Sequence, residues 1–377
     1  MKILYDYETM IIQNIGGVSR YHYELARHIR KQNDVDIPVL FSRNYYFEKY
    51  FKKKAWNYQN RYLKWFLRKI NAVYTFGVLT KAYLSGKPYD VIHSTFYNPD
   101  YIYLYYKLID KNHRSKFFIT IYDMIQEMEA SERPNMKRSA RAKKKALGVA
   151  DGIIAISQKT KDDLLEYYPF VQEDRIKVIY LSSNKTSEKQ PQNKNKRIFD
   201  YKYVLFVGER VERKNFRRVL EAMGKIHKDM PELHLVCTGG GKFNEEEEQL
   251  IENAGMKGLV CQKFFDDEDL YSLYANAECF IFPSLYEGFG LPILEAWSRN
   301  CPVLLSTASC FPEIAQDAAL YFDGNSTDEI EICLRKMVES DELKNEFREK
   351  GRRRLADFSW GKMARETQQW YSEIIEK

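Results

Sequence analysis

Residues 282–296 combine acidic side chains and glycines in a pattern that could bind a phosphorylated sugar. The stretch predicts a strand, a loop that contains Gly288 and Gly290, and a helix that begins near Pro292. Proline fits the first turn of a helix, where its missing N–H costs nothing. The two glycines therefore leave bare amides before a helix N-terminus, which is a natural site for an anion.

Glu287 and Glu295 lie close to this anion site, although carboxylates repel phosphate. We therefore expect them to bind neutral groups of the ligand. Eight positions turn through about 800° of helix, so Glu287 and Glu295 would not share a face of one continuous helix. Glu287 therefore belongs to the loop and Glu295 to the helix, where both can accept hydrogen bonds from sugar hydroxyls. A helix-capping Glu287 with a surface Glu295 is the alternative, but it leaves both glycines unexplained.

Residues 207–215 supply the cations that a diphosphate requires. They predict a strand followed by a turn into a helix, and the turn contains Arg210, Arg213 and Lys214. These side chains can neutralise a leaving phosphate in the transition state without a metal. A basic turn can also be merely solvated, but its place directly after a strand favours a binding site.

Neither a metal nor another cofactor is expected. Asp34 and Asp36 lead into a predicted strand and are interpreted as turn residues. The cysteines form no C-x-x-C or Cys/His cluster, so we expect buried, reduced thiols. They all lie in the second half of the chain, at Cys237, Cys261, Cys279, Cys301, Cys310 and Cys333.

A second glycine pair, Gly16 and Gly17, follows the first predicted strand and opens the first predicted helix. Glycine lets the backbone approach a ligand closely at a helix N-terminus. Together with the loop at 282–296, the pair predicts one ligand clamped between two domains.

The elements that must position these residues alternate along the chain, which is typical of a parallel sheet covered by helices. Strands are predicted at 2–5, 36–41, 91–94, 116–121, 152–156, 177–180, 203–207, 233–237, 259–263, 279–282 and 302–306. Helices are predicted at 18–31, 159–168, 216–227, 268–277, 292–299 and 360–375. The expected fold class is α/β, with two doubly wound, Rossmann-like parallel-sheet domains that face a central cleft.

The length of 377 residues suits two domains. A polar stretch at 182–193 without apolar periodicity predicts the linker between them. We therefore expect one domain at 1–185 and a second at 195–360, with ligands at the carboxyl ends of the strands.

The two halves of the chain differ in net charge. Counting Lys and Arg as positive and Asp and Glu as negative gives +15 for residues 1–200 and −9 for residues 201–377. A basic half attracts polyanions such as nucleic acid, an anionic membrane or a phosphorylated ligand, or it is simply solvated. Segment 43–84 interleaves Lys and Arg with many aromatic residues, which suits a membrane interface or nucleic acid. An amphipathic helix pair with its aromatics packed inward fits equally well.

Localisation is predicted from the absence of hydrophobic runs. No stretch of about 18 uncharged apolar residues occurs, and the N-terminus lacks a signal-peptide core. We expect a cytoplasmic protein, with possible peripheral docking on the cytoplasmic face of the membrane through 43–84.

These residues together resemble the retaining glycosyltransferases of family 4, also described as glycosyl transferases group 1, which have the GT-B fold. The resemblance extends over nearly the whole chain, and its most specific part is the E-x7-E stretch from Glu287 to Glu295. Supporting matches lie at 16–21, 156–161, 239–241, 284–292 and 311–314.

The resemblance implies roles for individual residues. It implies that Glu287 contacts the donor sugar, that Glu295 holds the ribose and that Lys214 binds the diphosphate together with Arg210 or Arg213. The loop residues Gly288, Phe289, Gly290 and Leu291 are implied to lend backbone amides to sugar and phosphate. The expected donor-binding set also contains Gly16, Gly17 and Gly239, which lie in two of the supporting matches. The resemblance also implies that the domain at 1–185, completed by the helix at 361–377, is the acceptor side and that the domain at 195–360 binds the nucleotide sugar.

Two departures from the family pattern affect the site. Glu209 stands where the family often has arginine, which leaves Arg210 and Arg213 as the two candidates for that role. Tyr122 stands before Asp123 where family members often have histidine. Asp123 remains a candidate catalytic residue of the first domain.

We therefore expect a retaining, metal-independent hexosyltransferase that uses a UDP- or GDP-sugar. Its acceptor would be a saccharide or lipid-linked saccharide in surface polysaccharide or glycan biosynthesis. A nucleotide-sugar epimerase or a phosphorylase on the same scaffold is an alternative. A basic nucleic-acid-binding protein is another, but it gives no account of Glu287 and Glu295.

Overall fold

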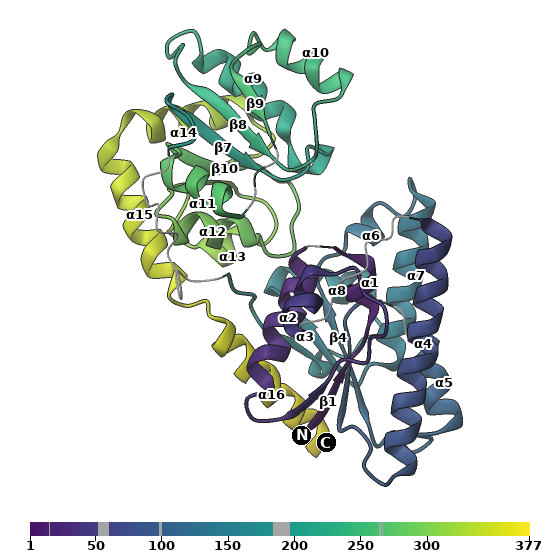
Figure 1. The fold of residues 1–377 in the computed structure, drawn as a ribbon. Helices are drawn as coiled ribbons and strands as arrows, with labels where there is room; N and C mark the ends of the chain where they lie inside the picture. Colours follow the sequence, from purple (N-terminus) through teal and green to yellow (C-terminus); the bar gives the residue numbers. More distant parts are fainter. Residues whose placement is uncertain (15, 52–59, 98–99, 184–196, 264, 266) are drawn as a thin grey trace. The chain divides into compact units, whose positions relative to one another are not determined.

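The computed structural model describes residues 1–14, 16–51, 60–97, 100–183, 197–263, 265 and 267–377. The chain forms two compact units (Figure 1). Unit 1 contains Met1–Leu181 and Trp360–Lys377, and unit 2 contains Ser182–Ser359. From residue 184 onward, the expected linker at 182–193 lies outside the described residues.

The described part of unit 1 contains a six-stranded parallel sheet in the order β2-β1-β3-β4-β5-β6. Its strands are β1 Lys2–Tyr5, β2 Asp34–Asp36, β3 Val91–Ser94, β4 Lys116–Ile121, β5 Gly152–Ala155 and β6 Ile176–Val178. The chain moves from β1 outward to β2 and then returns to the other side of β1 with β3. The order therefore reverses between β1 and β3, where doubly wound sheets place their ligands.

The second strand differs from the prediction, because β2 ends at Asp36 and the expected strand at 36–41 is wrong beyond its first residue. Pro38 has no N–H to donate to a strand ladder. Helix α4 (Arg61–Leu84) holds this segment instead. Asn71 accepts from the Leu40 amide at 2.8 Å and donates to the Phe41 carbonyl at 3.0 Å.

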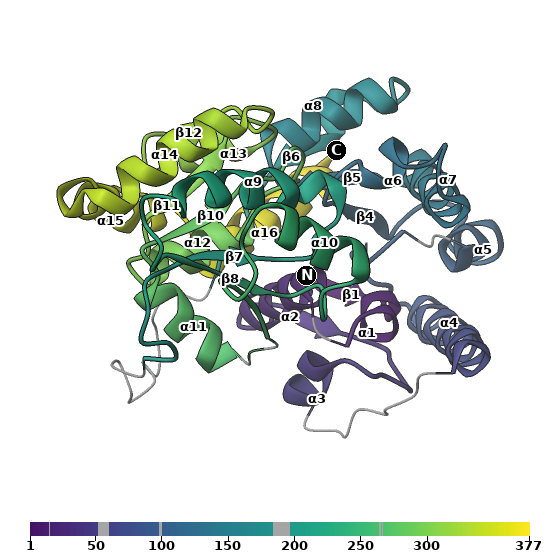
Figure 2. The same cartoon turned by 90° about the horizontal axis from the view of Figure 1, so that it is seen from above.

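Helices cover both faces of this sheet. Right-handed crossovers place helices on opposite faces when the strand order reverses. Helices α2 (Gly17–Ile29) and α16 (Trp360–Glu376) pack together on one face. The other face carries α4, α5 (Asp100–Leu108), α7 (Pro134–Val149) and α8 (Gln158–Tyr167), as Figure 2 shows. Three short helices, α1 Glu8–Ile12, α3 Tyr45–Phe51 and α6 Ile125–Met128, lie in the connections.

A buried hydrogen-bond network ties α16 to the sheet of unit 1. The Tyr371 hydroxyl lies 2.6 Å from His93 Nδ1 and 3.2 Å from the Tyr5 hydroxyl. His93 Nε2 lies 2.9 Å from Thr120 Oγ1, so both ring nitrogens have partners. Burial lowers the pKa of His93 to about 3, because a charged imidazole would lose its hydration there. The last helix of the chain is therefore fastened to β1, β3 and β4.

The described part of unit 2 has a second parallel sheet, in the order β12-β11-β10-β7-β8-β9. Its strands are β7 Tyr203–Val207, β8 His234–Thr238, β9 Val260–Gln262, β10 Cys279–Phe282, β11 Val303–Ser306 and β12 Leu320–Phe322. Its helices are α9 Phe216–Ile226, α10 Glu245–Asn253, α11 Asp267–Asn276, α12 Leu291–Ser298, α13 Phe311–Ala315, α14 Thr327–Glu339 and α15 Asp341–Leu355. The predicted two-domain α/β fold is confirmed.

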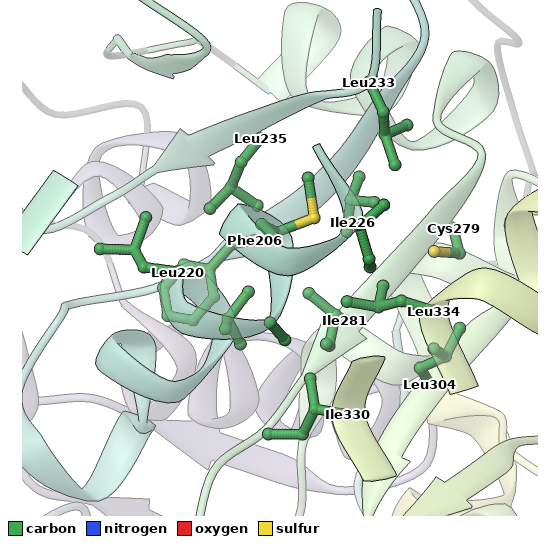
Figure 3. Close-up of a cluster of buried hydrophobic side chains, with 14 of the residues drawn as sticks. Phe206, Leu220, Ile226, Leu233, Leu235, Cys279, Ile281, Leu304, Ile330 and Leu334 are labelled. Atoms are coloured by element: carbon green, nitrogen blue, oxygen red, sulfur yellow. The ribbon is translucent and has the colours of Figure 1, made fainter. Parts of the chain in front are cut away.

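One core cluster of unit 2 joins strands β7, β8 and β10 to α9 and α14 (Figure 3). Phe206, Leu220, Ile281 and Leu334 are among its fully buried members. Such side chains each contribute roughly 1.5–3 kcal/mol through removal from water. The cluster fixes β7 beside β10 and so places the loops that follow these strands.

No described helix has the length and the apolar run that crossing a bilayer requires.

Replacement Tyr371→Phe should lower the free energy of unfolding of unit 1 by about 1–3 kcal/mol, because His93 Nδ1 and the Tyr5 hydroxyl each lose a buried partner. Urea unfolding followed by circular dichroism measures the change. Tyr167→Phe is the control, because Tyr167 is exposed on α8. Equal midpoints for the two variants would show that the network adds nothing to the attachment of α16.

Candidate active site

Two loops of unit 2 meet at the carboxyl edge of its sheet. They are residues 208–215 after β7 and residues 283–290 after β10, and their strands are neighbours although other elements separate them in sequence. The Leu285 amide donates to the Arg213 carbonyl at 2.8 Å. The Asn215 side chain donates to the Pro283 carbonyl at 3.2 Å. These bonds fix the two loops to each other at the switch point of the sheet.

The loops bring together three of the predicted site residues. Lys214 Nζ forms a close ion pair with Glu287 Oε1. Arg213 Nη1 lies 3.6 Å from the same oxygen, which is an ion-pair distance but too long for a hydrogen bond. All three side chains are largely buried, with 13% of Lys214, 14% of Glu287 and 26% of Arg213 exposed. One carboxylate thus faces two cations, and the group keeps a net positive charge.

The position of Glu287 is fixed through its main chain by Ser309, a residue that the sequence analysis did not identify. The Glu287 amide donates to Ser309 Oγ at 3.1 Å, and the same hydroxyl donates to the Glu287 carbonyl at 2.6 Å. Ser309 has a φ of 58°, which is uncommon for serine. Its only sequence signal is its place just before the predicted match at 311–314.

Asn215 is a second site residue that the sequence analysis left without a role. It has a left-handed φ of 59° and precedes α9, and its side chain is nearly fully buried. Besides Pro283 it binds the Gly324 carbonyl at 2.6 Å. Asparagine tolerates this backbone conformation better than most residues, which explains its presence at the turn.

The glycine loop ends at α12, as predicted. Gly290 is the N-cap of α12 with a φ of 92°. A φ in this range strains any other residue, and a Cβ atom would also approach Ile293 Cδ1 to 2.9 Å, so glycine is favoured at position 290. Phe289 is 3% exposed and packs edge to face on Phe358, while Leu291 is the first residue of α12. The Phe289 side chain therefore belongs to the core, and its contribution to a ligand would come from the main chain.

Glu295 lies one turn into α12, apart in sequence from the loop that holds Glu287. The side chain is half-buried, and Tyr274 of α11 is next to it. Burial and, second, the charge of Glu295 raise the pKa of Tyr274 well above its usual value. Glu295 therefore lies beside Tyr274, where α11 packs against α12.

Arg210 has a different environment from Arg213. Its guanidinium is 1% exposed and binds Glu247 on α10, with Nε 2.7 Å from Oε1. The other two nitrogens donate to the carbonyls of Gly239 at 2.8 Å and Gly241 at 2.9 Å. Since all three nitrogens already have partners, Arg210 holds the loop after β8 in place. Of the two arginines, Arg213 is the one that lies beside Lys214 and Glu287.

Gly239 lies where the loops after β7 and β8 touch. Its φ is 90°, and a Cβ atom would meet the Gly208 carbonyl carbon and oxygen at 3.1 Å. Glycine is required at this close approach.

The predicted residues Gly16, Gly17 and Asp123 belong to unit 1. Gly16 is the N-cap of α2 and Gly17 its first residue. The Asp123 carboxylate accepts from the Ile125 amide at 3.0 Å, next to α6. The preceding Tyr122 points its hydroxyl at His22 Nε2, 2.7 Å away. The residue that replaces the frequent family histidine is therefore itself paired with a buried histidine.

The described residues contain no group of three or more His, Cys, Asp or Glu side chains arranged to hold a metal ion. All the cysteines are free thiols, and all are buried except Cys261, which is half-buried. The expectation of buried thiols is wrong for Cys261, because it lies on the edge strand β9.

Comparison with known proteins gives matches over both parts of the chain. Residues 15–182 match the model for Glycosyltransferase Family 4, and residues 186–354 match the model for Glycosyl transferases group 1. Together the two matches account for most of the chain.

Two curated relatives are O-antigen chain mannosyltransferases. Mannosyltransferase B of Escherichia coli is 34% identical over 42% of this chain and 42% of its own length. RfbU of Salmonella typhimurium is 30% identical over 45% of this chain and 46% of its own length. The chain thus spans less than half the length of either relative.

Solved structures share the fold over the full chain. Sucrose-phosphate synthase from Thermosynechococcus elongatus has a TM-score of 0.75 at 17% identity and covers 100% of both chains. HepE from Anabaena, in complex with UDP and glucose, has a TM-score of 0.74 at 16% identity and covers 99% of both chains.

Replacement Arg210→Gln should lower the free energy of unfolding of unit 2 by about 3 kcal/mol, because it leaves the Glu247 carboxylate without its buried partner. Arg213→Gln should change it by less than about 1 kcal/mol, since Arg213 is more exposed and Lys214 still pairs with Glu287. Guanidinium unfolding of the two variants provides the comparison. A reversed order of stabilities would contradict the assignment of Arg210 to loop support.

Proposed function

Because the chain belongs to glycosyltransferase family 4 and has the GT-B fold, we propose that it is a retaining hexosyltransferase. Its donor is a UDP- or GDP-linked hexose such as mannose, glucose or N-acetylglucosamine. Its acceptor is a saccharide or lipid-linked saccharide in the synthesis of a surface polysaccharide or glycan. The O-antigen mannosyltransferase relatives and the UDP- and glucose-bound neighbour support this choice of substrates.

The observation that carries the proposal is the cluster of Lys214, Arg213 and Glu287 at the ends of β7 and β10. As the bond between the sugar C1 and the phosphate oxygen breaks, negative charge accumulates on the diphosphate. Lys214 and Arg213 are already in place to meet that charge, because Glu287 and the cross-loop bonds hold them there. A preorganised charge of this kind typically lowers the barrier by about 3–4 kcal/mol.

Glu287 has two tasks in this mechanism. Its carboxylate positions both cations, and its second oxygen can accept a hydrogen bond from a hydroxyl of the donor sugar. A carboxylate accepts such bonds strongly because it is charged. Binding through sugar hydroxyls explains why an acid belongs next to a diphosphate site.

Glu295 and the start of α12 complete the donor site in this proposal. Glu295 accepts from the ribose hydroxyls, as acidic residues do in related nucleotide-binding folds. The main chain of Gly288 and Gly290 lies at the N-terminus of α12, where the helix dipole favours a phosphate.

Retention follows from attack on the face from which the phosphate leaves. The acceptor hydroxyl forms its bond to C1 while the C1–O bond to the diphosphate breaks, and the departing phosphate oxygen takes the acceptor proton. The bonds and the proton balance without a protein base on the opposite face. Lys214 and Arg213 supply the charge that a divalent metal would otherwise provide, so we propose metal-independent transfer.

The reaction is proposed to take place in the cytoplasm, where nucleotide-sugar donors are made. A lipid-linked acceptor would place it on the cytoplasmic face of a membrane. The alternative activities have no support among the relatives described above. An epimerase would convert the donor without an acceptor, a phosphorylase would need free phosphate, and a nucleic-acid-binding protein would give salt-sensitive gel shifts.

Lys214→Ala and Glu287→Ala should each lower kcat for transfer by at least about 100-fold, because the first removes a cation that stabilises the leaving diphosphate and the second removes the carboxylate that positions that cation. Release of UDP or GDP from a panel of nucleotide sugars, with and without acceptor, measures the rate and identifies the donor. Lys257→Ala is the matched control, since Lys257 is exposed on unit 2 away from both loops. Normal turnover by both site variants, with folding verified by circular dichroism, would refute the proposed site.

A further inference from the structure

Helix α4 of unit 1 carries apolar side chains on its outward face as well as on its inward face, where Leu67 and Leu79 are buried. Its inward face includes Asn71 and Thr75, both fully buried and bonded to the segment after β2. Its outward face carries large apolar side chains at steps of three and four residues, which is the spacing of one helical stripe. The most exposed members are Tyr62 at 84%, Trp65 at 59%, Phe66 at 54%, Val73 at 72% and Leu84 at 76%. A stripe of this size is unusual on a surface without a partner.

The neighbouring helices extend this surface. Helix α5 packs on α4 and exposes Leu104 and Leu108. The Tyr103 hydroxyl of α5 donates to the Lys145 carbonyl of α7 at 2.8 Å, so α5 also contacts α7. Since α4, α5 and α7 cover the same face of the sheet (Figure 2), their outward sides form one surface, which we call the α4–α5–α7 face.

The charge of the α4–α5–α7 face is positive. Neither α4 nor α7 contains an aspartate or glutamate. The exposed cations of α7 are Lys137, Arg138, Arg141, Lys144 and Lys145. On α4, Lys69 interrupts the apolar stripe with an exposed ammonium group. The acidic residue of the three helices is the exposed Asp100 at the start of α5, so the face combines apolar side chains with a net positive charge.

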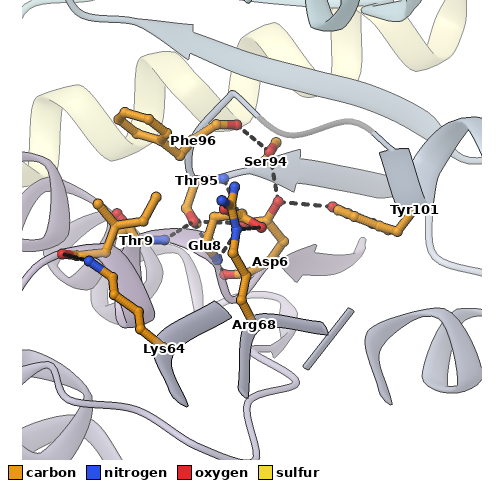
Figure 4. Close-up of polar contacts among 10 residues, drawn as sticks. Asp6, Glu8, Thr9, Lys64, Arg68, Ser94, Thr95, Phe96 and Tyr101 are labelled. Atoms are coloured by element: carbon orange, nitrogen blue, oxygen red, sulfur yellow. Dashed lines mark hydrogen bonds and ion pairs between the residues drawn. The ribbon is translucent and has the colours of Figure 1, made fainter. Parts of the chain in front are cut away.

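The α4–α5–α7 face is rigidly attached to the carboxyl edge of the unit 1 sheet (Figure 4). Arg68 of α4 reaches inward and forms two bonds to the Glu8 carboxylate, at 3.1 and 2.6 Å. Glu8 is fully buried beside Asp6, which follows β1 and accepts from the Ser94 hydroxyl and the Thr95 amide at the end of β3. The strand order reverses between β1 and β3, which is where doubly wound sheets bind ligands. Arg68 therefore bonds α4 to this part of the sheet.

We propose that the α4–α5–α7 face docks unit 1 on an anionic lipid bilayer. Tyr62, Trp65 and Phe66 enter the headgroup region, where aromatic side chains are favoured. The cations of α7 lie over the negative surface, and each contributes to binding within a Debye length of it. The choice of a lipid-linked acceptor rests on the proposed function, but binding to the bilayer does not.

A bilayer fits the face better than the other partners that it could accept. A second copy of the chain would bring the same positive surface against itself in a two-fold interface, which repulsion opposes. Nucleic acid is held by aromatic rings that stack on bases, whereas Leu63, Val73 and Leu84 on this face are aliphatic. An anionic lipid surface uses the aliphatic side chains, the aromatic rings and the cations together.

The structure also shows which side chains of the predicted docking segment are exposed. The expected docking segment 43–84 includes residues 52–59, which lie outside the described residues. Phe47 and Leu67 are buried, so these two apolar side chains pack inward. The proposed surface keeps the outward side of α4 and adds α5 and α7, which the sequence analysis did not include.

Vesicle flotation of the full chain tests the proposal, with phosphatidylcholine alone and with an equimolar mixture of phosphatidylcholine and phosphatidylglycerol. We expect recovery with the anionic vesicles, less at high salt, and little with the neutral ones. The double variant Trp65→Ser, Phe66→Ser should lower the partition coefficient at least about tenfold through lost apolar burial. Ile332→Ser with Ile375→Ser is the matched control, because these exposed residues lie on α14 and α16 and should leave recovery unchanged.

A second pair of variants tests the charges. Lys137→Gln with Arg141→Gln should lower the partition coefficient roughly tenfold or more through the loss of two cations. Arg352→Gln with Arg353→Gln on α15 is its control and should have no effect. Nucleotide release from donor alone, measured without lipid, should be the same for all four double variants, which separates a failure of docking from a failure of the proposed reaction.

Three outcomes would overturn the proposal. The first is equal recovery with neutral and anionic vesicles. The second is a dimer in light scattering that Trp65→Ser with Phe66→Ser dissolves, which would assign the face to a second copy of the chain. The third is tighter binding to a DNA or RNA oligonucleotide than to the anionic vesicles.

Discussion

The ion pair between Lys214 and Glu287, with Arg213 beside it, is the interaction on which the candidate site depends. Two cations this close would repel each other if the carboxylate were absent, and the repulsion would be stronger in a largely buried position than in water. Glu287 therefore allows a concentrated positive charge to exist before any ligand arrives. The same carboxylate leaves one net positive charge, which suits a ligand that is anionic at one end and rich in hydroxyls at the other.

Holding that pair requires most of the architecture of unit 2. The order of the strands brings β7 beside β10, and the Leu285 amide and Asn215 side chain join the loops that follow them. Arg210 secures the adjacent loop after β8 against α10. The bonds to Arg213, Pro283 and Gly239 satisfy backbone carbonyls, so support for the site and stability of the fold come from the same bonds.

The sequence was sufficient for the fold class and for the two loops, because alternating strands and helices and the glycines before Pro292 are local signals. It could not separate Arg210 from Arg213, since the difference depends on Glu247 and on carbonyls about thirty residues away in the chain. Ser309 was missed for the same reason. The strand expected at 36–41 failed because Asn71, a polar residue from a later helix, competes for its backbone groups. Long-range polar contacts, which carry no periodicity, account for these differences.

The charge distribution of unit 2 restricts the kind of anion that the site can accept. Residues 201–377, which comprise most of unit 2 together with α16 of unit 1, carry a net charge of −9, yet Lys214 and Arg213 place a local positive charge at the strand ends. Screening limits the reach of surface charges to about 8–10 Å in physiological salt, so the acidic surface does not cancel the site. A long polyanion would have to run onto that acidic surface and would be repelled. In the proposed function a small diphosphate contacts only Lys214, Arg213 and their neighbours, so we expect the site to select ligands by their length as well as by their charge.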